Sequence, residues 1–242
     1  MSPRRVGFTL IELSIVLVII GLLVGGVLMG KALIQQAEIR AAVSQLQKFE
    51  TAYRTFESKY GCIMGDCLNA TDFFGMNYVV VVAGCPPSGG AGNGNGDGNG
   101  FIDGTWACET IQAGKSLALS GLLPTSATTP CSSSISFFKG INDSCGYFYK
   151  DDFYGMGTPI KINAMTWATT TAASTTNGGA LSPVQARLID EKIDDGKPSS
   201  GKFRGLDTAL SSGGGIVANS CKISSTYNLN EDFTCRSLYY LK

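Results

Sequence analysis

Residues 8–30 read FTLIELSIVLVIIGLLVGGVLMG, and Glu12 is the only charged side chain among them. Built as an α-helix at 1.5 Å per residue, this stretch is about 34 Å long, enough to cross a hydrocarbon core of about 30 Å. Ahead of it lies a short leader, residues 1–7, that carries Arg4 and Arg5. Basic residues at this place hold the N-terminus in the cytoplasm and direct the following chain outward. We therefore expect a membrane-spanning helix here and an extracytoplasmic domain after it.

An ordinary cleavable signal peptide is the alternative interpretation of this stretch. Its apolar core would be shorter and a small-residue cleavage site would follow, whereas residues 31–33 continue a helix. Further on, apolar side chains recur every three or four residues, as on one face of an amphipathic helix. These positions are Ile39, Val43, Leu46, Phe49 or Glu50, Tyr53, Phe56 and Tyr60. We expect a single helix from Phe8 to about Lys59, roughly 78 Å long.

The composition of the chain argues against several classes of function. The 242 residues include 19 basic and 19 acidic side chains, so the net charge is zero and no nucleic-acid partner is indicated. The sequence contains no histidine, which removes the commonest general base, the Ser-His-Asp arrangement and most zinc sites. We expect no enzyme. With 31 glycines but 44% hydrophobic residues, the part after the helix is expected to be a loop-rich, β-containing domain.

All the cysteines lie beyond the long helix, and their number is even. This pattern indicates disulfides formed in an oxidising compartment. A metal site is the competing interpretation because the first two are spaced C-x4-C, but no second short pair and no histidine accompany them. Eight cysteines allow 105 connectivities, of which pairing between sequence neighbours is the simplest. The pairs would be Cys62–Cys67, Cys85–Cys108, Cys131–Cys145 and Cys221–Cys235.

Glu12 is the residue that a plain membrane anchor does not explain. A carboxylate within a spanning helix costs about 2.5–3.5 kcal/mol on insertion scales, so it needs water or a partner. One interpretation is that Glu12 lies hydrated at the interface, near the helix start, where a negative charge suits the helix dipole. The other interpretation is that the carboxylate has a function, and the residues around it favour this one.

The string GFTLIE, residues 7–12, follows a basic leader and precedes an uninterrupted apolar run. Together these features resemble the processing signature of type IV pilins and type II secretion pseudopilins. The resemblance implies that a prepilin peptidase cuts between Gly7 and Phe8 and methylates the new N-terminus at Phe8. It also implies that Glu12 neutralises the ammonium of a neighbouring subunit, so that two charges that are costly in a membrane become one satisfied pair.

The same resemblance implies partners and a location. The partners would be identical or related pilin-like subunits, the prepilin peptidase and an inner-membrane assembly platform. The chain would cross the bacterial inner membrane once and place its domain in the periplasm or on a filament. Gly21 and Gly25, like Gly26 and Gly30, have a G-x-x-x-G spacing that permits close helix packing. Glycine is frequent in membrane helices in any case.

The sequence predicts three parts and an α+β fold class. Residues 1–7 form the leader, residues 8–60 the long helix, which spans the membrane at about 8–30, and residues 61–242 the globular domain. The long helix, half membrane-spanning and half amphipathic, would pack on a small β-containing domain stapled by disulfides.

Short elements are expected within this domain. One helix would cover residues 111–123 and stop at Pro124, and another would run from an N-cap at Ser182, through Pro183, to about Lys192. Strands are expected at 134–139, 146–150 and 159–165, a loop at 166–176, a turn at 211–215, and edge strands at 216–217 and 237–241.

The low-complexity loop at residues 88–100, SGGAGNGNGDGNG, has two interpretations. Compared with the calcium-binding pattern D-x-[DN]-x-[DN]-G, it offers oxygen donors at alternate positions and a glycine at the turn. These donors are Asn95, Asp97, Asn99 and Asp103. However, an asparagine stands at the first position, and Trp106 stands where a closing glutamate is expected. Calcium is one interpretation, and a flexible Asn-Gly turn without any cofactor is the other.

Two kinds of function remain open. The first is a structural subunit of a type II secretion-like pseudopilus or of a type IV pilus. The second is a membrane-anchored periplasmic binding module that keeps its leader and uses the calcium-like loop. The Gly7–Phe8 junction and Glu12 favour a filament subunit, since a plain anchor needs neither. Residues 65–75 and 181–198 resemble segments of a subgroup of bacterial pseudopilin-like proteins, which favours the secretion type.

Overall fold

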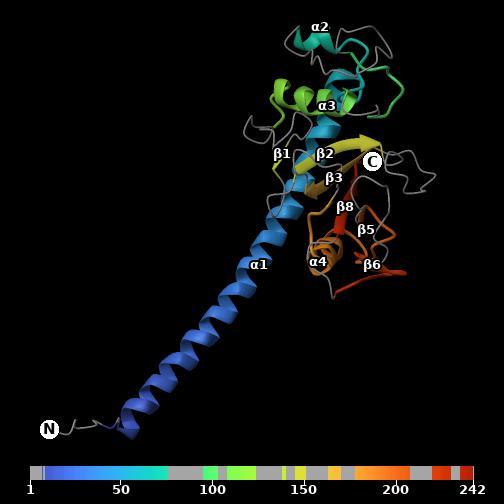
Figure 1. Ribbon diagram of the computed structural model, residues 1–242. Helices are drawn as coiled ribbons and strands as arrows, with labels where there is room; N and C mark the ends of the chain where they lie inside the picture. The colour runs from blue at the N-terminus through green and yellow to red at the C-terminus, as the bar shows by residue number, and fades with distance from the viewer. Residues whose placement is uncertain are drawn as a thin grey trace, which may run out of the picture. The chain divides into compact units, whose positions relative to one another are not determined.

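The computed structural model describes residues 7, 9–75, 95–102, 108–123, 138–139, 145–150, 163–169, 178–207, 220–229 and 235–241 (Figure 1). The chain forms two compact units, Met1–Ala41 and Ala42–Lys242. The division falls within a single helix, α1, which runs from Leu10 to Tyr60. The predicted boundary after Tyr60 coincides with the end of α1. The second compact unit begins earlier, at Ala42, and so includes the last turns of this helix.

Helix α1 confirms the long helix that the apolar run and the amphipathic face predicted. It ends at Gly61, whose φ of 69° lies in the left-handed region and whose N–H donates to the carbonyl of Glu57 at 2.9 Å. Every large apolar side chain from Leu10 to Ile34 is at least half exposed. By length and composition the helix can cross a membrane.

The second unit contains an antiparallel sheet with the strand order β1-β2-β3-β8-β5, and β4 also pairs with β3. A separate hairpin joins β6 to β7. The strands are β1 (Phe138–Lys139), β2 (Cys145–Lys150), β3 (Asn163–Thr169), β4 (Gly178–Gly179), β5 (Phe203–Asp207), β6 (Lys222–Ile223), β7 (Thr226–Tyr227) and β8 (Cys235–Tyr240).

Strand β8 lies inside the sheet, so the expectation of an edge strand at 237–241 is wrong. Tyr239 is opposite Met165 of β3 on one side and opposite Phe203 of β5 on the other, and all six residues of β8 are buried. The polar side chains at the start of the strand gave the misleading signal. Arg236 is nevertheless buried, because its guanidinium donates to the carbonyl of Asp207 from Nε at 3.2 Å and from Nη2 at 3.1 Å.

The other strand predictions are confirmed in part. Strand β2 begins one residue before the expected 146–150, and β1 falls within the expected 134–139. Strand β3 lies later than the expected 159–165, and residues 166–169 are strand rather than loop. The Thr- and Ala-rich composition predicted a loop, but pairing with β2 and β8 makes these residues extended. The expected elements at 211–215 and 216–217 lie outside the described residues.

The helices of the second unit are α2 (Ala70–Phe74), α3 (Cys108–Leu119) and α4 (Pro183–Ile193). Helix α4 confirms the predicted cap. The hydroxyl of Ser182 accepts from the N–H of Gln185 at 3.2 Å, and the side chain of Gln185 accepts from the N–H of Ser182 at 3.1 Å. This reciprocal pair satisfies two backbone donors that a helix start otherwise leaves free.

Helix α3 begins earlier and ends earlier than the expected 111–123. Gly121, with a φ of 72°, follows its last turn and donates its N–H to the carbonyl of Ala118 at 3.2 Å. A glycine in the left-handed region, rather than Pro124, therefore ends the helix. The short helix α2 occupies a segment that the sequence assigned to a loop.

Two disulfides join sequence neighbours, as the simplest pairing predicted. Cys62 pairs with Cys67 and Cys221 with Cys235, at Cα separations of 5.3 and 4.6 Å. The Cys62–Cys67 bridge argues against a metal site at the C-x4-C spacing, because both sulfurs are used in the disulfide. Cys85 and Cys131 lie outside the described residues, as do the side chains of Cys108 and Cys145.

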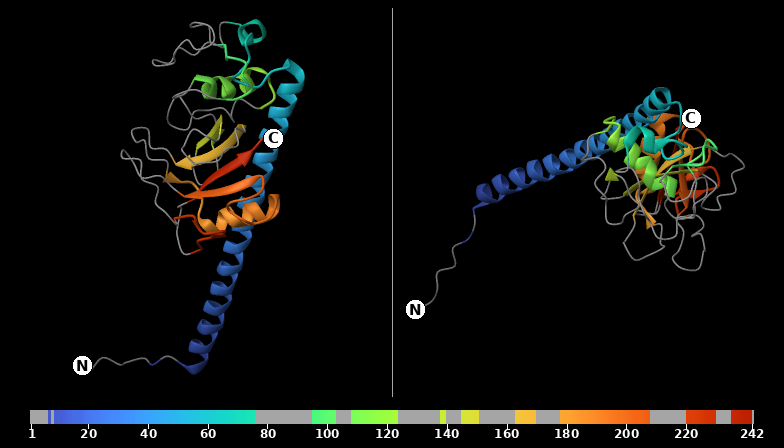
Figure 2. Two further views of the ribbon diagram at one scale, coloured as in Figure 1. Left: turned by 90° about the vertical axis from the view of Figure 1, so that its right-hand side faces the viewer. Right: turned by 90° about the horizontal axis from the view of Figure 1, so that it is seen from above.

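Within the second unit, the last turns of α1 lie along the sheet, and α4 packs near β5, β7 and β8 (Figure 2). The buried face of this part of α1 carries the side chains expected from the amphipathic pattern. They include Leu46, Phe49, Tyr53 and Phe56, each at most 3% exposed. At the end of α1, the ring of Tyr60 packs at a tilt against those of Phe73 and Phe74 of α2, with centroids 5.2 Å apart in each case.

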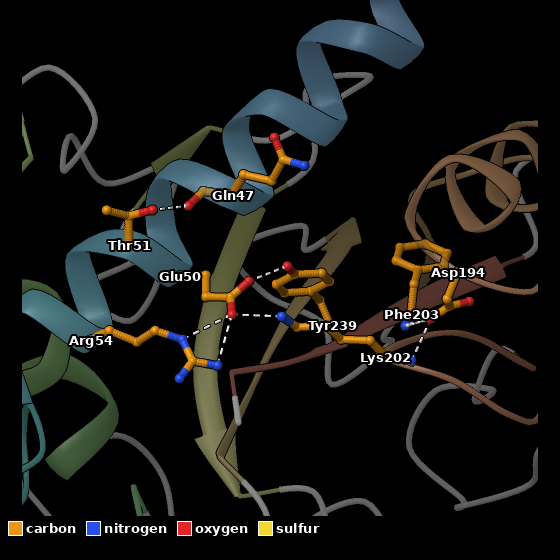
Figure 3. Close-up of polar contacts among 8 residues, drawn as sticks. All are labelled: Gln47, Glu50, Thr51, Arg54, Asp194, Lys202, Phe203 and Tyr239. Carbon is orange, nitrogen blue, oxygen red and sulfur yellow. Dashed lines mark hydrogen bonds and ion pairs between the residues drawn. The ribbon is translucent and has the colours of Figure 1, made fainter.

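One carboxylate ties α1 to the sheet. Glu50 accepts from the hydroxyl of Tyr239 at 2.5 Å, from Nζ of Lys202 at 2.6 Å and from Nε of Arg54 at 3.0 Å (Figure 3). Partial burial disfavours the charged form of Glu50. The bonds from Lys202, Tyr239 and Arg54 outweigh that effect and hold the pKa of Glu50 below its ordinary value.

We expect Glu50→Gln to lower the free energy of unfolding of the second unit by about 1–3 kcal/mol, because charge-assisted bonds are lost at a half-buried position. Urea unfolding of the full-length chain in non-ionic detergent measures this, with the exposed Glu38→Gln on the same helix as control. Since the pKa of Glu50 is lowered on folding, its contribution is complete above about pH 4.3. The contribution is lost as the pH falls through the folded value, so the two proteins should converge in acid. Equal stabilities at pH 7 would mean that the contact contributes nothing.

Candidate functional site

The first turn of α1 holds Glu12 in a reciprocal cap. One oxygen of its carboxylate, Oε2, accepts from the backbone N–H of Thr9 at 2.8 Å and from the hydroxyl of Thr9 at 2.7 Å. In return, the hydroxyl oxygen of Thr9 accepts from the N–H of Glu12 at 3.3 Å. Leu10 begins the helix, so Thr9 is the N-cap residue and Glu12 is at the third helical position. This is the geometry of a capping box.

The cap gives Glu12 a fixed place at the tip of an exposed helix. Gly7 is exposed next to it, whereas Phe8 lies outside the described residues. Both bonds from Thr9 use Oε2, so within the described part of the chain Oε1 is left for a donor from elsewhere. A cation approaching the helix start would find a carboxylate that is oriented and accessible.

Below this tip, the first unit presents apolar side chains and open positions. A Cβ built on Gly21, Gly25, Gly26 or Gly30 would meet no atom within 4 Å. The two G-x-x-x-G pairs are therefore not needed for packing within the first unit. They leave shallow places on the helix surface where another helix can approach closely, which is how small residues act between membrane helices.

Sequence reasoning identified Glu12 but missed Thr9. The signal was present, because Thr9 and Glu12 have the S/T-x-x-E spacing of a capping box immediately before an apolar run. The expected helix start at Phe8 places Thr9 inside the helix, whereas the structure begins the helix at Leu10. The roles of helix cap and membrane charge are compatible, because a capping carboxylate keeps its charge.

The calcium-like loop packs tightly where the structure describes it. The N–H of Gly96 donates to the carbonyl of Cys67 at 2.9 Å, and that of Gly98 donates to the carbonyl of Asp66 at 3.1 Å. A Cβ on Gly96 would lie 2.3 Å from Cα of Asp66, so a larger residue cannot fit there. Residues 95–102 are thus a segment fastened to the turn that follows α1, and the glycines permit the close approach.

Two of the predicted calcium donors accept hydrogen bonds from backbone N–H groups. The Asn95 side chain accepts from the N–H of Thr71 at 3.0 Å, and the Asn99 side chain accepts from the N–H of Phe101 at 2.8 Å. Asp103 lies outside the described residues. Calcium bound by Asn95, Asp97, Asn99 and Asp103 stays a prediction.

Asp97 instead belongs to a group that the sequence did not indicate. Carboxylate oxygens of Asp97, Asp66 and Glu109 lie within 4.8 Å of one another. Asp66 is buried and accepts from the N–H groups of Gly98 and Gly100 at 2.7 Å each. Burial, reinforced by Asp97, raises the pKa of Asp66 to about 6. Three carboxylates of this kind are the hard oxygen ligands that calcium prefers, and only the tertiary structure brings them together.

Comparison with known protein families gives one match, at the N-terminal end of the chain. Residues 4–28 match the family model of the prokaryotic N-terminal methylation motif. The chain carries the type IV pilin and pseudopilin signature. The motif supports a type IV pilin-like or pseudopilin subunit and indicates a structural protein rather than an enzyme. No curated protein and no solved structure matches the chain.

The matched residues include the cap formed by Thr9 and Glu12. Gly7, Thr9 and Glu12 lie within the motif, together with the first apolar turns of α1. The rest of the chain, including the sheet and the two disulfides of the described residues, lies outside it. The motif thus identifies the part of the molecule that carries Glu12, and the domain has to be explained from its own contacts.

Replacing Thr9 by valine should open the first turn of α1, because the hydroxyl that bonds Glu12 is lost. Losing an N-cap costs about 1 kcal/mol of helix stability. We therefore expect the Glu12 amide to exchange its hydrogen about five times faster. Exchange measured in detergent micelles tests this, and Thr9→Ser, which keeps the hydroxyl, is the matched control. If valine and serine gave equal protection, the cap would not stabilise the helix start.

Proposed function

We propose that this chain is a structural subunit of a type II secretion-like pseudopilus. Prepilin peptidase cuts it between Gly7 and Phe8 and methylates Phe8, and the mature chain then assembles through α1. The observation that carries the proposal is the methylation motif at residues 4–28, with Glu12 held at the tip of the apolar helix.

The exposed apolar surface of α1 supports assembly through this helix. Burying apolar surface is worth about 25 cal/mol per Å², so water cannot be the lasting environment of these side chains. Lipid satisfies them in the membrane, and related helices satisfy them in a filament. A chain can exchange one environment for the other at little hydrophobic cost, and the open positions at the glycines allow close packing.

The charge chemistry at the tip supports the proposed order of events. Cleavage after Gly7 creates an ammonium at Phe8, and an unpaired charge is costly in the membrane. In a filament, the carboxylate of Glu12 neutralises the ammonium of a neighbouring subunit. Thr9 contributes by keeping that carboxylate in one orientation before the neighbour arrives, which lowers the entropy lost on pairing.

The proposal places the chain in the bacterial inner membrane, crossed once, with the domain in the periplasm or on the filament. Its partners are related pilin-like subunits, prepilin peptidase and an inner-membrane assembly platform. A type IV pilus subunit is the alternative, because the same motif serves both kinds of filament. Long surface fibres containing this chain under native expression would favour the pilus.

The mature N-terminus tests the proposal directly. Intact-mass and peptide mass spectrometry of the chain from its native membrane should find residues 1–7 removed and a methyl group on Phe8. A chain that still begins at Met1 would overturn the proposal and favour a membrane-anchored binding module instead.

Glu12→Ala should leave membrane insertion intact and prevent ordered assembly, because the neighbour's ammonium then has no partner. Membrane fractionation measures insertion, and cross-linking between subunits measures assembly. Glu38→Ala, an exposed acidic residue on the same helix, is the matched control and should assemble normally. Normal assembly of Glu12→Ala would contradict the proposed charge pair.

At the cleavage junction, we expect Gly7→Ala to be processed and Gly7→Leu to accumulate as precursor, since a bulky side chain should obstruct the cut. Gel mobility and the mass of the N-terminal peptide distinguish the two forms. Efficient cleavage of the leucine variant after residue 7 would contradict the assigned junction.

A further inference from the structure

The last turn of α4 carries a buried carboxyl group, that of Asp190, which has no part in the proposed assembly. Asp190 is 0% exposed, and it accepts from the hydroxyl of Tyr227 at 2.7 Å and from the N–H of Gly196 at 3.2 Å. These bonds join α4 to the β6–β7 hairpin and to the loop 194–202. A single buried side chain therefore holds three parts of the domain together.

A second carboxyl group shares this place. Asp194 follows one turn later, and carboxylate oxygens of Asp190, Asp194 and Asp195 all lie within 4.8 Å of one another. Asp194 accepts from the N–H of Phe203 at 2.9 Å and also from that of Lys202. Two carboxylates this close, one of them without solvent, repel strongly unless something positive lies between them.

The basic side chains of the surrounding elements bond elsewhere. On α4, Arg187 pairs with Glu191 at 2.7 Å. From β5 and β8, Arg204 lies over the ring of Tyr240, and Arg236 bonds the carbonyl of Asp207.

In the loop 194–202 and in the β6–β7 hairpin, lysine side chains also bond to residues other than these aspartates. Lys202 reaches Glu50, and Nζ of Lys222 donates to the hydroxyl of Ser199 at 3.2 Å. Lys192 and Lys197 are exposed, and the phenol of Tyr239 bonds Glu50. Within the described residues, no lysine or arginine forms an ion pair with Asp190, Asp194 or Asp195.

We propose that Asp190 and Asp194 share one proton in the folded domain, and that this proton is a pH-sensitive lock on the loop 194–202. Asp190 carries the proton and donates it to Asp194, while Tyr227 donates to the remaining oxygen of Asp190. Asp194 stays ionised and holds the backbone N–H groups at the start of β5. When the proton leaves, two adjacent negative charges remain and the loop is pushed from α4.

The lock also reaches α1. Asp194 bonds the backbone of Lys202 and Phe203, and the side chain of the same Lys202 bonds Glu50 (Figure 3). Loosening the loop would therefore weaken one of the contacts that hold the last turns of α1 against the sheet. The consequence is a loop that holds the Lys202 contact to α1 less firmly in alkali than at neutral pH.

The electrostatics of the pair agree with a shared proton. Burial, with the adjacent Asp194, raises the pKa of Asp190 to about 8. Burial also disfavours the charged form of Asp194, but bonds from Asp190 and from the backbone outweigh it and keep the pKa of Asp194 below its ordinary value. Because the pKa of Asp190 is raised on folding, the stability it supplies is complete below its unfolded value, about 3.9, and is lost as the pH rises through the folded value.

The test is urea unfolding of the full-length chain in non-ionic detergent between pH 6 and pH 10, followed by tryptophan fluorescence. In the wild type, the unfolding equilibrium constant should rise about tenfold per pH unit up to about pH 8 and then level off. Asp190→Asn, whose amide can donate to Asp194 without titrating, should remove this rise. Glu191→Gln, an exposed acid on the same helix, is the matched control and should keep it.

Two further measurements make the outcome decisive. Carbon NMR of labelled aspartate should find one carboxyl group titrating near pH 8 in the wild type and in Glu191→Gln but not in Asp190→Asn. Tyr227→Phe removes a donor that stabilises the ionised form, so the titration should move to higher pH. An unchanged pH dependence in Asp190→Asn would overturn the proposal. So would removal of the wild-type dependence by millimolar calcium alone, since a cation would then occupy the place of the proton.

Discussion

Exposed apolar surface is the constraint on which the rest of this structure depends. The large side chains from Leu10 to Ile34 are all at least half exposed, and the helix that carries them has the length and composition to cross a membrane. Such a surface is stable only against lipid or protein, because its contact with water costs free energy in proportion to area. A helix under this constraint has to be anchored, packed among other helices, or both in turn.

In the second unit, by contrast, α1 is buried on one side and has to remain attached to a folded domain. Apolar side chains such as Leu46 and Phe56 supply the buried area, but apolar contacts alone do not fix how far a helix has turned or slid. Glu50 adds direction, since a carboxylate that bonds Tyr239 and Lys202 has to lie at one place on the sheet. Cys221–Cys235 then links the start of β8, the strand that carries Tyr239, to the residue before β6.

Acidic side chains have three different tasks in this molecule, and their surroundings decide which. Glu12 is exposed and capped by Thr9, so it remains a charge available to a partner. Glu50 meets two cationic side chains and a phenol, so it remains charged inside a structural contact. Asp190 meets another carboxyl group and no solvent, so its charge is suppressed. The same functional group thus caps a helix, joins a helix to a sheet or loses its charge according to burial and partner.

From the sequence alone we could predict the long helix, its apolar half, the position of Glu12, the cap of α4 at Ser182 and the two disulfides of the described residues. Each follows from local physics: hydrophobic periodicity, the needs of a helix start and pairing over short loops. The tertiary structure alone decided that β8 lies inside the sheet, that residues 166–169 are extended, and that Asp97 meets Asp66 and Glu109. It also decided the partners of Glu50 and Asp190, which come from residues distant in the chain. Strand order and the meeting of distant side chains depend on which segments share a core, and no local pattern records that choice.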